Sequence, residues 1–175
     1  MSGIVGKGED ERSGFVGKFP SGIKNAEQWR LNGNFTGSVD PIADDWELVD
    51  APVGFGTIGS NMAVNSGLWT FPQTGIWQVT FHGHFIHTNV SFYNGVGIKT
   101  TTDNSTYAIA AVRYSQNAEG SNSHSSADVS VIVDVTDTTN VLVSFYNQMQ
   151  NSGVTTSGTT ASNQTSVTFI RLGDT

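Results

Sequence analysis

The segment Ser66–Phe85, SGLWTFPQTGIWQVTFHGHF, decides the fold of this chain. It begins with a short apolar run, turns at a Pro-x-x-Gly element and continues as a long segment in which apolar and polar residues alternate. Alternation with a period of two places successive side chains on opposite faces of a β-strand. We therefore expect a strand with Trp77, Val79, Phe81 and Phe85 on its core face, and Gln78, Thr80, His82 and His84 on the other.

Further strand-length segments surround this one, separated by turn residues, and none of them has the period of a helix. A series of short strands without a helix is typical of an all-β sandwich or barrel. The apolar last segment is expected to be a central, buried strand, whereas residues 116–126 and 151–163 are expected to be polar loops. The predicted strands are Asp45–Ala51, Gly67–Phe71, Ile76–Thr88, Phe92–Thr101, Tyr107–Tyr114, Asp128–Val135, Asn140–Met149 and Thr165–Leu172.

The composition excludes several classes of partner and site. The 175 residues include no cysteine, which removes disulfides, thiol catalysis and zinc–thiolate sites. The net charge is −7, so we expect no nucleic-acid partner bound through its phosphates. No segment approaches the roughly 20 apolar residues of a membrane-spanning helix, and we expect no membrane partner.

Charged residues are concentrated near the N-terminus. Residues 1–50 hold 9 acidic and 5 basic side chains, and residues 51–175 hold only 6 and 3. Charged side chains are a usual defence of exposed sheet edges against pairing with other chains. We therefore expect the edges to be covered by closure, oligomerisation or assembly.

Residues 1–44 form a separate region in this interpretation. Glycines interrupt any regular period, but separated apolar residues remain, which is unusual for a solvated linker. We predict an extended N-terminal arm over 1–44 that gains order by docking on another surface, followed by a β-sandwich domain over 45–175. The predicted anchors of the arm are Phe15, Phe19, Trp29 and Phe35.

Residues 45–175 resemble the globular head domain of complement C1q-like proteins. The family pattern has a Pro-x-x-Gly turn followed by an aromatic strand with His-x-His. The residues that carry the resemblance are Gly67, Phe71, Pro72, Gly75, Trp77, Phe81, His82 and His84, with weaker likeness in residues 128–148 and 166–172.

This resemblance implies an antiparallel jelly-roll sandwich of the complement and tumour-necrosis-factor (TNF) type, assembled as a homotrimer. In such a trimer Trp77, Phe81, Phe85 and Phe145 would make core and trimer contacts. The chain departs from the complement family because it has no collagen-like Gly-X-Y run and no obvious counterpart of the calcium-binding loops in residues 86–127.

The N-terminal sequence MSGIVG, followed by Arg12–Gly17 (RSGFVG), resembles the openings of virion structural proteins of tailed bacteriophages. This resemblance implies a virion structural protein. Together with the expected trimer and the docking arm, it leads us to expect a trimeric capsid decoration (cement) protein on the capsid surface, whose arm binds the shell of major capsid protein. The alternative is the receptor-binding head of a tail or head fibre that recognises a host glycan or protein. A complement-like ligand of a cellular organism is less favoured, because residues 1–14 lack the apolar core of a signal peptide.

No catalytic constellation emerges from the sequence. His82, His84 and His87 form the one suggestive cluster, but a His-x-His jelly-roll enzyme also needs a nearby Glu and a distant His, whereas here the next residues of those types are Glu119 and a loop His124. We expect packed or interfacial imidazoles rather than a metal site, no cofactor and no enzymatic activity. The strand aromatics are expected to form core or trimer contacts rather than sugar platforms.

Overall fold

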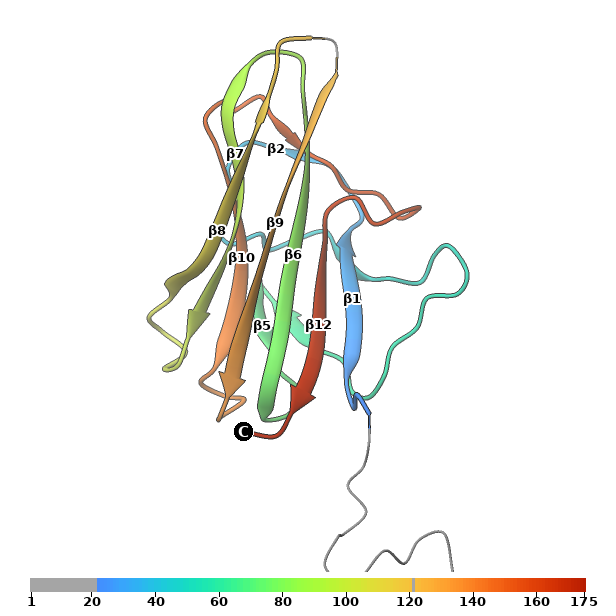
Figure 1. The fold of residues 1–175 in the computed structure, drawn as a ribbon, viewed down its shortest axis with the longest axis vertical. Helices are drawn as coiled ribbons and strands as arrows, with labels where there is room; N and C mark the ends of the chain where they lie inside the picture. The colour runs from blue at the N-terminus through green and yellow to red at the C-terminus, as the bar shows by residue number, and fades with distance from the viewer. Residues whose placement is uncertain (1–21, 121) are drawn as a thin grey trace, which may run out of the picture.

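The computed structural model describes residues 22–120 and 122–175, which form two packed antiparallel sheets (Figure 1). These ranges contain strands and no helix, and therefore no helix long and apolar enough to cross a membrane. Phe15 and Phe19 lie outside the described residues. The strands are β1 (Ala26–Leu31), β2 (Phe35–Thr36), β3 (Trp46–Leu48), β4 (Ala63–Asn65), β5 (Leu68–Thr70), β6 (Gly75–His87), β7 (Ser91–Thr101), β8 (Ala108–Asn117), β9 (Ser123–Val135), β10 (Leu142–Met149), β11 (Thr155–Thr156) and β12 (Ser166–Gly173).

The first sheet, sheet A, is built around β6. Its order is β2-β11-β6-β12-β1-β3, and β9 pairs with β6 along the full length of that strand. The second sheet, sheet B, has the order β4-β5-β10-β7-β8. The polypeptide crosses repeatedly between the sheets, as expected of a jelly roll.

All eight predicted strands are present, and the predicted central position of the last strand is confirmed because β12 lies between β6 and β1. Four short strands were not predicted: β1, β2, β4 and β11. The loop predicted over 116–126 is shorter than expected, because β8 continues to Asn117 and β9 begins at Ser123.

The boundary predicted after residue 44 is wrong for the described residues. β1 pairs with β12 on one side, where Figure 1 shows the two strands next to each other, and with β3 on the other, so it is an interior strand of sheet A. Arg30 of β1 is fully buried, and its guanidinium donates to Glu47 at 2.7 Å and to Asp50 at 3.0 Å. Residues 26–31 are therefore part of the sandwich.

Trp29 and Phe35 consequently do not act as anchors for a separate surface. The Trp29 ring packs edge-to-face on Trp69 at 5.2 Å between ring centroids. Phe35 belongs to β2, pairs with β11 and packs against the core of its own chain. Both side chains are tied to the sandwich that they were predicted to extend from.

The alternation predicted for the β6 segment is confirmed, with every second residue from Gly75 to His87 buried. The side chains of Trp77, Phe81, Phe85 and Phe145 are essentially inaccessible to solvent within one chain. They therefore form the interior of the sandwich, and no trimer contact is needed to cover them.

Trp69 of β5 occupies the centre of this core. Its ring lies 5.2 to 5.7 Å from four other aromatic rings, which come from both sheets. Contacts of this geometry add a specific attraction to the burial of apolar area. The four rings belong to Trp29, Trp46, Phe145 and Phe169.

One side of the sandwich is open. Among the described strands β8 pairs only with β7, and β9 pairs only with β6, so both present an unpaired edge. These edges lie together, because Ser115 of β8 and Ser125 of β9 approach to 3.2 Å between hydroxyl oxygens. Most of β8 is exposed, and Arg113 is its one charged residue. We call the two unpaired edges of β8 and β9 the open side.

We predict that Trp69→Ala lowers the free energy of unfolding by about 3–5 kcal/mol, the usual cost of truncating a fully buried aromatic residue. Trp69→Phe keeps part of the ring contacts and should cost less. Phe55→Ala is the control, because this aromatic lies at the surface and its removal should change stability by no more than about 0.5 kcal/mol. Urea denaturation measures all three, and equal losses for Trp69→Ala and Phe55→Ala would contradict the central role of Trp69.

Candidate functional site

His82 and His84 of β6 lie on the outer face of sheet A and belong to two separate pairs. His82 Nδ1 is 2.8 Å from a carboxylate oxygen of Asp128, and His84 Nε2 is 3.0 Å from Nδ1 of His124. His87 is turned away from both pairs, is nearly buried and bonds to the backbone of Asn89. Within residues 22–120 and 122–175, no three His, Cys, Asp or Glu side chains are grouped to hold a metal ion.

The sequence reasoning missed the partner of His84 because it placed His124 in a loop. β9 begins at Ser123, so His124 is part of the strand. In its register with β6, Ile86 lies opposite His124 and His84 lies opposite Ser126. His124 is therefore the diagonal neighbour of His84 on the same face, and the two rings stack nearly parallel. The pKa of His84 is lowered, first by burial and second by the neighbouring charge of His124.

A groove on the outer face of sheet B is the better candidate for a ligand. Its floor is β7, between β8 on one side and β10 on the other. In this register Gly95 lies between Tyr114 and Gln148, and Gly97 lies between Val112 and Tyr146. The groove has a volume of about 340 Å³, and its lining residues are Ser38, Asp40, Lys99, Ile109, Val112, Tyr114, Tyr146, Asn147 and Gln148.

The two glycines of the floor allow the tyrosines to lie close to the sheet. A Cβ atom on Gly95 would collide with the ring of Tyr114, and one on Gly97 would collide with the ring of Tyr146. Glycine inside a strand weakens the strand and often marks a close approach of other atoms. At both positions the atoms that approach closely belong to a tyrosine ring, and β7 keeps a regular register with β8 from Gly95 to Gly97.

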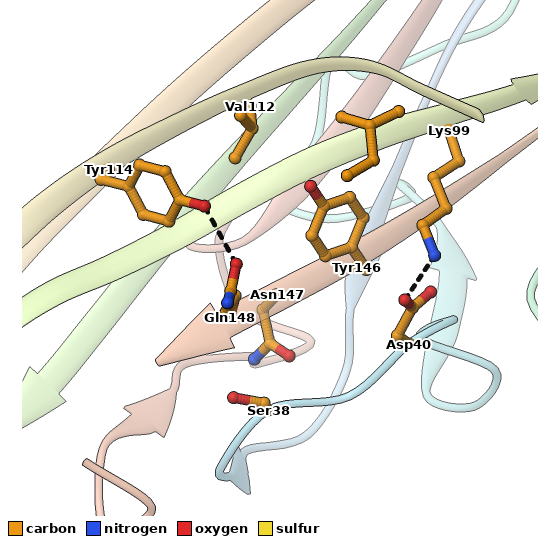
Figure 2. Close-up of a pocket in the computed structure, with 9 residues that line it drawn as sticks. Ser38, Asp40, Lys99, Val112, Tyr114, Tyr146, Asn147 and Gln148 are labelled. Atoms are coloured by element: carbon orange, nitrogen blue, oxygen red, sulfur yellow. Dashed lines mark hydrogen bonds and ion pairs between the residues drawn. The ribbon is translucent and has the colours of Figure 1, made fainter. Parts of the chain in front are cut away.

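The polar groups of the groove are arranged in two bonded pairs (Figure 2). The Tyr114 hydroxyl donates to Gln148 Oε1 at 2.9 Å, and Lys99 Nζ donates to Asp40 at 2.5 Å. Tyr146 lies between these pairs, with Lys99 Nζ 5.2 Å from its ring centroid. Burial, followed by the charges of Tyr114 and Asp40, raises the pKa of Tyr146, so its hydroxyl keeps its proton and can donate a hydrogen bond.

A second hollow of about 260 Å³ continues past Tyr114 and is lined by Tyr93, Tyr114 and Gln148. The rings of Tyr93 and Tyr114 meet edge-to-face at 5.7 Å between centroids. Tyr114 and Gln148 therefore separate two adjoining hollows that share one wall.

The groove has the chemistry of a binding site. It contains aromatic surface, hydroxyls, an amide and one ion pair, and no serine of its lining is paired with a histidine base. The groove forms on a sheet face from three strands, together with Ser38 and Asp40 from the segment between β2 and β3. No single segment of the sequence carries its signal, apart from the spacing of Gly95 and Gly97.

The His84–His124 pair predicts a loss of stability in acid. A lowered pKa means that folded His84 binds fewer protons than unfolded His84, so its contribution is complete above its ordinary pKa of 6.5 and is lost as the pH falls through the folded value. His84→Gln should therefore reduce the dependence of the unfolding free energy on pH between about 7.5 and 5. Urea denaturation across this range tests it, and parallel pH profiles for variant and parent would contradict the coupling.

Comparisons with known proteins support the fold and leave the site unassigned. No protein-family model and no curated protein match the sequence. Among solved structures, murine APRIL at pH 5.0 matches at 10% identity and a TM-score of 0.60, over 85% of this chain and 98% of that chain. Eiger TNF from S. frugiperda matches at 13% identity and a TM-score of 0.60, over 86% of this chain and 93% of that chain. Identities this low show the fold alone, and that fold is an all-β, TNF-like jelly-roll sandwich.

Proposed function

We propose that this chain is a non-enzymatic structural protein that works as a homotrimer on the surface of a bacteriophage capsid. The observation that carries the proposal is the open side of the sandwich, where two sheet edges end without a partner strand among the described residues. A long exposed edge with few charges is a surface that other chains can pair with or pack on. Assembly with further copies protects it.

The exposed apolar residues of this region agree with such a contact. Ile109 of β8 is 59% exposed and Ile132 of β9 is 69% exposed, although both belong to well-formed strands. A ring of three copies needs a heterologous contact, in which one surface of each copy meets a different surface of the next. The outer face of sheet A is suited to be the second surface, because uncharged Thr80, Ser130 and Thr168 occupy the middle of it.

Attachment to the shell is assigned to the residues that precede β1. Their sequence contains Ile4, Val5, Phe15, Val16 and Phe19 between glycines, and it resembles the openings of phage virion proteins. A trimer brings three such segments to the same place on the shell. Because binding of one segment raises the effective concentration of the others, three weak contacts give a strong attachment.

The second candidate function is a receptor-binding head on a tail or head fibre. The tyrosine groove favours it, because a concave surface with aromatic walls and a few polar groups is typical of a ligand site. A decoration protein needs no such groove to hold the shell together.

We predict that deleting residues 1–21 leaves folding and trimer formation intact and abolishes binding to capsids, because every strand from β1 to β12 is retained. Deleting residues 1–44 is the matched comparison and should instead unfold the protein, since it removes the interior strand β1 with the buried Arg30. Sedimentation with emptied capsids measures the binding. If the chain without residues 1–21 still saturated the shells, the attachment proposal would be wrong.

Gold labelling of intact particles with an antibody to this chain separates the two candidate functions. Label over the whole head at high copy number is the result expected for a decoration protein. Label confined to the tail or to one vertex would contradict that role and support the receptor-binding head.

A further inference from the structure

We propose that the groove between β7, β8 and β10 binds a neutral saccharide, with one sugar ring against Tyr114 and its hydroxyl groups bonded to Gln148 and Tyr146. The site would provide the ligand-binding surface of a receptor-binding head. It deepens that second candidate function and rests on it, and all of its lining residues lie on one chain.

Exposed aromatic surface is the first argument. Tyr114 is 51% exposed and Tyr93 is 37% exposed, although both side chains are held in place, one by the bond to Gln148 and both by their mutual edge-to-face contact. A pyranose ring has an apolar face of C–H groups that packs on an aromatic ring. A rigid tyrosine offers this contact at a small loss of conformational entropy and adds a hydroxyl for a polar bond.

The polar groups beside the rings have hydrogen-bonding capacity left. Gln148 uses its Oε1 to accept from Tyr114, and its amide nitrogen has no hydrogen-bond partner among the described residues. The hydroxyl of Tyr146 likewise has no protein partner in the described part of the chain, and its raised pKa keeps the proton that it would donate. Alternating donors and acceptors next to an apolar ring suit the alternating hydroxyls of a sugar.

Charge selects a neutral ligand. Lys99 is the one cationic side chain of the groove, and it is already neutralised by Asp40. The complete chain carries a net charge of −7, so an anionic sugar or a phosphate would approach against an unfavourable field. A neutral hexose or N-acetylhexosamine is not repelled by the negative charge of the chain and needs no free cation in the groove.

The size of the groove limits the ligand to about one or two sugar rings. The main hollow, about 340 Å³, lies at the small end of ligand sites in proteins, which begin at roughly 300 Å³. The adjoining hollow beside Tyr93 shares Tyr114 and Gln148 with it. A disaccharide could therefore place one ring on each side of the Tyr114–Gln148 bond.

The groove also explains two glycines that are otherwise costly. Gly95 and Gly97 lie inside β7, where larger residues stabilise a strand better. They lower the floor under Tyr114 and Tyr146, so the rings lie along the sheet and leave space above it. Tyrosines raised by a Cβ in the floor would fill this space.

The experiment uses the full-length protein and a panel of methyl glycosides of glucose, galactose, mannose and N-acetylglucosamine, with glucuronic acid and sialic acid as anionic probes. Saturation-transfer NMR detects binding, and titration gives the dissociation constant. We expect at least one neutral glycoside to bind, with the strongest transfer to the ring protons of one sugar face. Tyr114→Ala should weaken this binding by roughly tenfold or more, a change of about 1.4 kcal/mol.

Two variants keep the result specific. Tyr114→Phe retains the ring and loses the bond to Gln148, so it should bind with an intermediate affinity. Phe55→Ala removes an exposed aromatic outside the groove and should leave the affinity unchanged. Circular dichroism establishes that each variant is folded.

The proposal is overturned if no neutral glycoside binds, if only the anionic probes bind, or if Tyr114→Ala binds as well as the parent chain. These outcomes are independent of attachment to capsids. A protein that binds a glycoside but not a shell would refute the decoration role and leave the groove proposal standing.

Discussion

The packing of Trp69 between the two sheets is the interaction on which the rest of this structure depends. Trp69 stands on sheet B, and Trp29, Trp46 and Phe169 reach it from sheet A. The chain has no cysteine and therefore no disulfide, so buried apolar and aromatic area holds the two sheets together. This contact also fixes where β1 lies, because Trp29 can reach Trp69 only if β1 is part of sheet A.

The long strands could be predicted because each carries its own pattern. The alternation in β6 and the apolar run of β12 depend on local sequence alone, and both were recognised. β1 was missed because its sequence AEQWRL has no clear alternation. Its burial comes from partners distant in sequence: Trp29 packs on Trp69, and Arg30 is neutralised by Glu47 and Asp50. Such contacts give residues 26–44 their structure and are not visible in a local pattern.

The candidate site was less predictable than the fold for the same reason. The groove combines Gly95, Tyr114 and Gln148, which become neighbours only through the register of three strands. His84 and His124 are likewise 40 residues apart and meet because β6 and β9 pair. The alternation of β6 was enough to place Phe81 in the core, but it could not show that Tyr114 and Gln148 lie on either side of Gly95.

The core of the sandwich is closed within one chain, whereas the edges of β8 and β9 have no partner strand among the described residues. The mass of the purified chain in dilute solution, measured by light scattering during gel filtration, tests this most directly. We predict a single species with three times the chain mass of 18.7 kDa. A species with the mass of one chain, stable in the same solution, would show that the edges of β8 and β9 need no partner and would contradict the trimer.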